Sequence, residues 1–147
     1  IRTFSNDTRD SIERWIEKIV ASVSEVFGAE HRVQFIHLVP PLINDEYASD
    51  IARSAVKACV GPDSVEDRQR PEMTGEDFAF YLEHIPGALV LVGSRDEEKG
   101  FTELLHSPRM DFDSRPLAVG CQVLCSIAYR ALASLNSGDG RLQGGHR

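Results

Sequence analysis

The sequence of 147 residues has no long hydrophobic run and no excess of positive charge. No stretch approaches the roughly 18 to 20 apolar residues that cross a bilayer, and no signal peptide is recognisable at the N-terminus. There are 16 Lys and Arg against 23 Asp and Glu, which gives a formal net charge of −7. Because binding to a phosphate backbone needs clustered Lys and Arg, we expect neither nucleic acid nor membrane among the partners. The expected partners are therefore small molecules and other proteins.

Cysteine is also scarce. The three cysteines, Cys59, Cys121 and Cys125, are odd in number and form no Cys-x-x-Cys pair. A disulfide framework is therefore not expected, which favours a reducing compartment and a cytoplasmic location. Cys59 and Cys125 fall on apolar helical stripes, so we interpret them as buried free thiols.

Several motifs of common enzyme classes are missing as well. The chain has no Gly-x-Ser-x-Gly elbow, no glycine-rich phosphate loop and no His-Glu-x-x-His motif, and no spacing suggests a Cys–His pair. These absences remove several enzyme classes. They leave isolated histidines and acidic residues as the candidates for chemistry.

The composition that remains is that of a globular protein, with 41% hydrophobic and 27% charged residues, and the length suits one domain or two small lobes. Apolar patterns predict strands at residues 1–5, 32–39 and 88–92. Apolar residues three and four apart predict four helices, which begin near Asn6–Thr8, Asn44–Asp45, Gly75 and Asp113–Ser114 and end near Gly28, Gly61, Ile85 and Leu135. This pattern predicts an α/β fold with a lobe boundary at residues 40–45.

The first strand–helix–strand segment contains too few strands to bury both faces of a sheet. We therefore expect that sequence upstream of Ile1 is missing. The polar, Gly-rich segment 136–147 is expected to be a disordered tail.

His106 is the first candidate for a functional residue. It lies on a loop, after the apolar pair Leu104–Leu105 and before Ser107–Pro108. A single histidine is more often a surface residue than a ligand, but a rigid Ser-Pro after it would fix the direction of the ring, as a ligand site requires. Because neutral imidazole binds zinc and manganese, we interpret His106 as a candidate metal ligand. Asp111 or Asp113 either orients this ring or caps the following helix.

Gly75 is the second candidate, in the segment Gly75-Glu76-Asp77. The simpler interpretation is a helix start, in which a glycine turn precedes two acidic residues that favour the positive end of the helix. In the alternative interpretation, the same positive helix end binds a substrate. Free N–H groups at a helix N-terminus can hold a substrate carboxylate, and a glycine lets the ligand approach the backbone closely.

These pieces, in this order, resemble one family of enzymes. The stretches that carry the resemblance are Ile1–Phe4, Pro40–Asp45, Met73–Phe78, Pro86–Ala88, Leu105–Pro108, Asp111–Asp113 and Gly120. Together they span nearly all of residues 1–135. In order and spacing they are similar to the hippurate hydrolases and the N-acyl-amino-acid and indole-acetyl-amino-acid amidohydrolases, within the aminoacylase and glutamate carboxypeptidase superfamily of zinc peptidases.

The resemblance implies the C-terminal part of a two-domain co-catalytic metallopeptidase fold of the α/β class. Residues 1–43 would then be the end of a lid or dimerisation domain and contribute half of its α+β layer. Residues 44–135 would be the closing segment of the catalytic α/β domain, followed by the tail at 136–147.

The resemblance also implies a site with two divalent metal ions, which would be zinc, manganese or cobalt. His106 matches the last metal ligand of the family, Gly75 matches a segment that lines the substrate pocket, and Arg2 matches a lid arginine facing the substrate carboxylate. The family's other ligands and its general base have no match in residues 1–147. No catalytic residue is therefore assigned, and we expect little or no hydrolysis from this chain alone, because a catalytic zinc typically has three protein ligands.

Two functions are consistent with this sequence. The first is a fragment of a metal-dependent amidohydrolase that cleaves the amide bond of N-acyl amino acids, such as hippurate, with a metal-activated water. The alternative is a non-catalytic pseudoenzyme or a subunit of a split enzyme. It would act by association, either as a homodimer through the lid region or by pairing with a chain that carries the missing N-terminal half, because an incomplete sheet leaves open edges.

Overall fold

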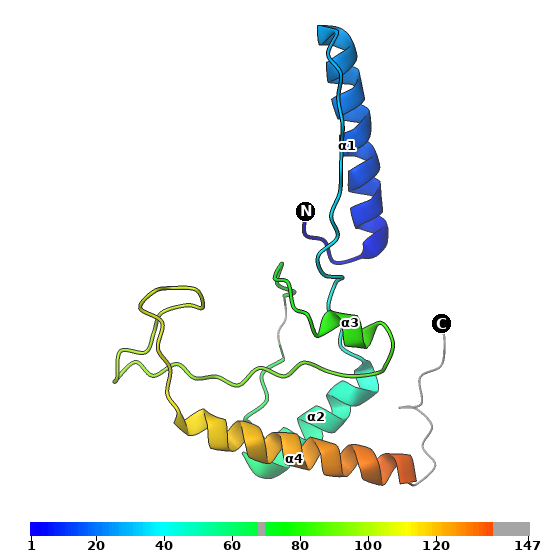
Figure 1. Cartoon of the computed structure of the whole chain (residues 1–147). Helices are drawn as coiled ribbons and strands as arrows, with labels where there is room; N and C mark the ends of the chain where they lie inside the picture. Colours follow the sequence, from blue (N-terminus) through cyan, green and yellow to red (C-terminus); the bar gives the residue numbers. More distant parts are fainter. Residues whose placement is uncertain (68–69, 137–147) are drawn as a thin grey trace. The chain divides into compact units, whose positions relative to one another are not determined.

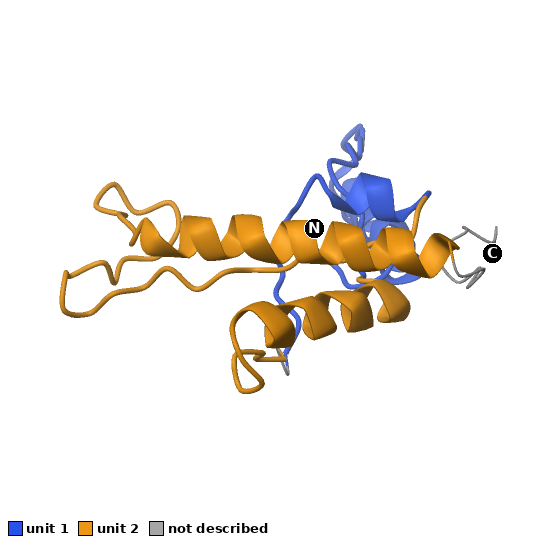
Figure 2. Cartoon of the chain, turned by 90° about the horizontal axis from the view of Figure 1, so that it is seen from below, with its two compact units in different colours: residues 1–43, 68–84 blue, residues 44–67, 85–147 orange. Residues whose placement is uncertain are grey.

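The computed structural model describes residues 1–67 and 70–136. This part of the chain contains the four helices α1 (Asn6–Phe27), α2 (Glu46–Cys59), α3 (Ala79–Leu82) and α4 (Arg115–Asn136) (Figure 1). The chain divides into two compact units, coloured separately in Figure 2: unit 1 is residues 1–43 and 68–84, and unit 2 is residues 44–67 and 85–147. The assignment of a lid and a catalytic domain stays a prediction. Residues 137–147 of the predicted tail lie outside the described residues.

In unit 1, α1 begins and ends at clear local signals. The Ser5 hydroxyl accepts a hydrogen bond from the backbone N–H of Thr8, so the N-cap lies one residue before the predicted Asn6–Thr8 group. Gly28 ends the helix as predicted, with a φ of 60° that a residue with a side chain rarely adopts. The N–H of Ala29 then donates to the carbonyl of Ser24 at 2.9 Å, which satisfies a carbonyl left open at the helix end.

The extended segment 32–39 runs back along α1 (Figure 1). One side of it faces the helix, because Val33 and Phe35 are half-buried and the His37 ring pairs with the Glu13 carboxylate at 2.8 Å. The other side carries Ile36 and Leu38, which are 74% and 77% exposed. The alternation expected of a strand is therefore present in the side chains.

The predicted strands themselves are not formed within the described residues. The segments 1–5, 32–39 and 88–92 belong to no β-ladder, and the β pairing found there is one antiparallel bridge between Asp96 and Phe101. A ladder needs a second strand whose N–H and C=O groups lie opposite, and apolar alternation does not supply that partner. The α/β class predicted from the pattern is therefore not confirmed by the helices and extended segments described.

In unit 2, α2 packs against α4. The Asp45 carboxylate caps α2 as predicted, accepting a hydrogen bond from the N–H of Ala48 at 2.8 Å. Ala52 and Ala55 of α2 and Val123 of α4 are buried. Polar contacts also join the helices. The Arg130 guanidinium donates to the Ser54 hydroxyl, the hydroxyls of Tyr47 and Ser134 are 2.6 Å apart, and the Cys59 thiol lies 3.9 Å from the carbonyl oxygen of Gln122.

Several large apolar residues of α4 are not buried. Leu117, Leu124 and Leu132 are 60%, 65% and 61% exposed. The side that meets α2 includes Val123 instead. The helix is apolar on more than one face, so its periodicity alone does not determine which face packs. Cys59 and Cys125 were expected to be buried, whereas Cys59 is half-buried and Cys125 is exposed, as is Cys121.

By length and composition alone, α4 is apolar enough to cross a membrane. Only 6% of its most apolar stretch is buried. Helices in the cores of soluble proteins meet the same criterion, so this observation carries little weight. The absence of a membrane partner stays a prediction.

Candidate metal-binding loop

His106 lies at the third position of a tight turn. The N–H of Ser107 donates to the carbonyl of Leu104 at 3.2 Å, and His106 has a φ of 71°. It is the one non-glycine residue with positive φ among residues 1–67 and 70–136. Positive φ at the third position is the mark of a type II turn, which glycine normally occupies. A residue with a Cβ in this conformation costs about 1–2 kcal/mol.

A second turn follows directly. The N–H of Met110 donates to the carbonyl of Ser107 at 3.0 Å, which places Pro108 at the second position of the turn, where proline is favoured. The Glu103 carboxylate holds the two turns together, since it accepts hydrogen bonds from the Ser107 hydroxyl and the Arg109 guanidinium, both at 3.0 Å. The backbone on both sides of His106 is therefore constrained.

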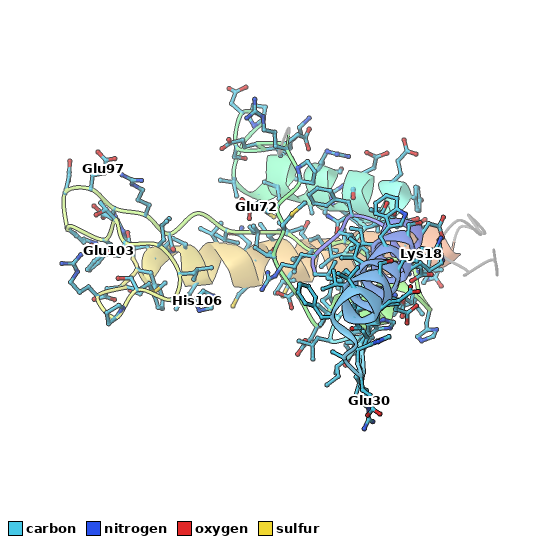
Figure 3. All side chains as sticks on the ribbon, turned by 90° about the horizontal axis from the view of Figure 1, so that it is seen from above. Lys18, Glu30, Glu72, Glu97, Glu103 and His106 are labelled. Atoms are coloured by element: carbon cyan, nitrogen blue, oxygen red, sulfur yellow. The ribbon has the colours of Figure 1, made fainter. Side chains whose placement is uncertain are left out.

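The His106 ring itself is exposed and makes no hydrogen bond to the described part of the chain. Figure 3 shows His106 and Glu103 on the loop that precedes α4. A fixed backbone with both ring nitrogens unengaged is an arrangement suited to a ligand. Residues 1–67 and 70–136 bring together no group of three or more His, Cys, Asp or Glu side chains that could hold a metal ion. His106 fits one position of a metal's coordination sphere, and the described residues place no second ligand beside it.

Neither acidic residue near His106 orients its ring. The Asp111 carboxylate accepts a hydrogen bond from the N–H of Phe112 at 2.8 Å, and Asp113 is buried and accepts one from the N–H of Arg115 at 3.0 Å. The capping interpretation is therefore correct for Asp113, and the ring-orienting interpretation is wrong for both. Hydrogen bonds from Arg115 hold the pKa of the Asp113 carboxyl well below its usual range.

A cluster of opposite charges, which was not predicted from the sequence, lies before α4. Asp96 lies in an acidic run with Glu97 and Glu98, yet its side chain is 12% exposed and pairs with the Arg115 guanidinium at 2.8 Å. Lys99 lies 3.5 Å from carboxylate oxygens of both Asp96 and Asp113. The spacing of Asp96 and Lys99, three residues apart, was the available signal; their pairing with residues 113 and 115 depends on how the loop folds.

The two predicted substrate-binding residues both lie in unit 1. The Arg2 guanidinium donates from Nη1 to the carbonyl of Met73 at 2.8 Å, which joins the N-terminal segment to the stretch before α3. Gly75 does not lie at a helix N-terminus, because α3 begins four residues later at Ala79 and has no side-chain cap. A Cβ built on Gly75 would lie 3.0 Å from Cγ2 of Val39, so a side chain here would press on Val39. The role of both residues in substrate binding stays a prediction.

Comparison with known proteins relates the chain to a peptidase family and to proteins named as hydrolases. Residues 10–130 match the family model described as peptidase family M20/M25/M40. A probable hydrolase of Synechocystis is 31% identical over 130 residues, which is 88% of this chain and 33% of that protein. An uncharacterized hydrolase of Staphylococcus aureus strain N315 is 34% identical over 119 residues, which is 80% of this chain and 30% of that protein. No solved structure gave a significant match.

The chain spans about a third of the length of the curated relatives it matches. The family match confirms the resemblance at the level of the superfamily of metallopeptidases, whose members generally bind divalent metals such as zinc, and it does not extend to hippurate hydrolases in particular. With the match covering residues 10–130, the loop that carries His106 included, the chain belongs to peptidase family M20/M25/M40.

Proposed function

We propose that this chain is the C-terminal part of a metal-dependent amidohydrolase that cleaves N-acyl amino acids, and that His106 is its metal ligand. The observation that carries the proposal is the exposed imidazole on a doubly constrained loop, within the residues that match the M20/M25/M40 family. The relatives are about three times as long, so the remaining ligands and the general base have room outside this chain.

The residues of this chain would have three tasks. His106 would occupy one coordination position, and the constrained turns would fix the direction in which its side chain leaves the backbone. When bound, a divalent metal ion supplies Lewis-acid activation for hydrolysis of the amide. Arg2 would face the substrate carboxylate: in the described residues its guanidinium makes one hydrogen bond, through Nη1, and its other donors remain for an anion. The segment at Gly75 would line the substrate pocket.

The native polypeptide that carries this sequence, purified from its source, provides the test. Its intact mass, its metal content and its release of amino acid from hippurate would be measured, and a His106→Ala variant would be compared with the unchanged protein. We expect hydrolysis that a chelator abolishes, and a loss of metal and of at least about 100-fold in activity in the variant. Unchanged metal content and activity in His106→Ala would overturn the proposal.

The second candidate is a non-catalytic protein or split-enzyme subunit that acts by association. It is supported by the extended segments 32–39 and 88–92, whose residues join no ladder in the described structure, and by the exposed Ile36, Leu38 and Leu91 along them. Such edges pair readily with another strand. The partner would be a second copy of this chain or a chain that carries the rest of the family domain.

Size measurement separates these outcomes. If the native polypeptide is about 16 kDa, metal-free and inactive, and if sedimentation shows a dimer or a complex with a longer chain, the second candidate holds. A monomer at micromolar concentration with no associated chain would exclude it. A native polypeptide of about three times this length with chelator-sensitive activity supports the first.

A further inference from the structure

The loop that carries His106 is closed at its base by the residues around it. The N–H of Asp113 donates to the carbonyl of Ser94 at 3.1 Å, so the two ends of the segment 94–113 meet. Within it, Asp96 and Phe101 exchange two backbone hydrogen bonds, at 3.1 and 2.8 Å. Figure 3 shows Glu97, Glu103 and His106 on this segment at the same end of unit 2.

The Asp113 carboxylate is the centre of this closure. It is 6% exposed, caps α4 through the N–H of Arg115, and forms an ion pair with the Arg115 guanidinium. Its other neighbour is Lys99, which also contacts Asp96, and Asp96 in turn pairs with Arg115. Two carboxylates and two cations therefore alternate around one point. The pairing joins the loop at residues 96–99 to the first turn of α4.

In the described structure, no hydrogen bond joins residues 103–112, the part of the loop around His106, to the rest of unit 2. In the described structure, the hydrogen bonds of residues 103–112 all join members of that stretch, and Glu103 ties the two turns to each other. The two turns therefore behave as a small rigid piece. Its attachment to unit 2 lies at the bridge of residues 96 and 101 and at Asp113. The direction of the His106 ring relative to α4 depends on these points.

We propose that Asp113 is a positioning residue for His106, acting through the closed base of the loop and not through contact with the ring. The inference rests on the proposed role of His106 as a metal ligand. It adds that this ligand is held in place by a carboxylate seven residues away, paired with Arg115 and Lys99. Asp113 and Lys99 hold the base, whereas Glu103 holds the turns.

The first test measures the loop directly in the full 147-residue chain. Asp113→Asn keeps the shape of the side chain but removes the charge that pairs with Arg115 and Lys99. We expect amide hydrogen exchange of residues 104–110 to become about tenfold faster, while exchange in α2 and in the middle of α4 stays unchanged. Asp111→Asn is the matched control, because the same substitution two residues away removes one local hydrogen bond to Phe112. Equal loop exchange in the two variants overturns the inference.

The second test measures metal retention in the native polypeptide, with zinc as the probe and a competing chelator. We expect Asp113→Asn to weaken zinc binding about tenfold and Asp111→Asn to leave it within about twofold, since supporting residues around a ligand change affinity by roughly 10- to 100-fold. If His106→Ala leaves zinc binding unchanged, the proposed function fails whatever the loop does. If His106→Ala loses zinc but Asp113→Asn does not, the positioning inference alone fails.

A fold defect in Asp113→Asn would be recognised by faster exchange throughout α2 and α4. In that event the variant Lys99→Met tests the inference. Lys99 is 48% exposed, so its replacement should not disturb the fold, and it removes one cation from the cluster while Arg115 stays paired. We expect at least about threefold faster exchange at residues 104–110 and no change in the helices. Unchanged exchange in the loop of this variant would contradict the inference.

Discussion

Asn44 pairs with Leu89 as if the two residues lay on neighbouring β-strands. The Asn44 side-chain carbonyl accepts a hydrogen bond from the N–H of Leu89 at 2.9 Å, and its amide donates to the carbonyl of Leu89 at 3.1 Å. One side chain thus satisfies both backbone groups of a residue in the extended segment 88–92. The N–H of Asp45 adds a hydrogen bond to the carbonyl of Gly87 at 2.9 Å. This part of the chain is held by the residues that start α2.

Replacing Asn44 should therefore destabilise unit 2. We expect Asn44→Ala to lower the free energy of unfolding by about 1–2 kcal/mol, because two hydrogen bonds to the backbone of the half-buried Leu89 are lost. The measurement is urea unfolding followed by circular dichroism. Asn6→Ala is the control, since Asn6 is exposed at the first position of α1 and its side chain bonds to no described residue. Equal stability of the two variants would show that the Asn44 pairing contributes nothing.

Because His106 has a positive φ, we expect a glycine variant at this position to be more stable than an alanine variant, the reverse of the usual order. Glycine adopts this conformation without strain, so we expect His106→Gly to be more stable than His106→Ala by up to about 1 kcal/mol. At Lys18, an exposed position within α1, the order should be reversed, with Lys18→Ala more stable than Lys18→Gly by about 1 kcal/mol. Thermal unfolding of the four variants tests both comparisons. Alanine more stable than glycine at residue 106 would contradict the turn described.

The pKa of Asp113 makes stability depend on pH in the acid range. Because the folded-state pKa lies below the unfolded one, the stabilisation is complete above the unfolded value, near pH 4, and is lost as the pH falls towards the folded value. We expect the difference in unfolding free energy between the unchanged chain and Asp113→Asn to be constant from pH 5 to 7 and to shrink below about pH 4. Urea unfolding across pH 2–7 measures it. A difference that stays constant down to pH 2 would disprove the linkage.

Gly75 should be sensitive to the size of its side chain. In Gly75→Ala the new Cβ would lie 3.0 Å from Val39, so we expect a loss of about 1 kcal/mol in stability. The double variant Gly75→Ala/Val39→Ala should show less than the sum of the two single effects, because the contact is relieved. Gly93→Ala is the control, since no atom lies within 4 Å of its Cβ position. Strict additivity would mean that the two residues do not press on each other.

The features that could be predicted from the sequence are those that depend on neighbouring residues. Asp45 caps α2 through an amide three residues away, and Gly28 ends α1 through its own φ, so both follow from local chemistry. The loop around His106 follows in the same way from Ser107 and Pro108. The positive φ of His106 does not, because it depends on how the two turns are tied by Glu103.

The features that could not be predicted depend on distant partners. The segment 88–92 has the composition of a strand, but the described residues place no second strand beside it, and composition does not reveal whether such a partner is present. In α4, Val123 and Leu124 are equally apolar neighbours, and the presence of α2 determines that the first is buried while the second is 65% exposed. The charges of Asp96 and Arg115 pair across the fold of the loop, at a distance that local spacing does not reveal.

The exposed apolar face of α4 links folding to association. Leu117, Leu124 and Leu132 lie outside the contact with α2, so a molecule that covers them would bind the helical form and have no comparable surface in the unfolded chain. By mass action, such a molecule raises the apparent stability as its concentration rises. The melting temperature of this chain is then a reporter of occupancy, and a rise in it on addition of another polypeptide would measure how strongly that polypeptide binds.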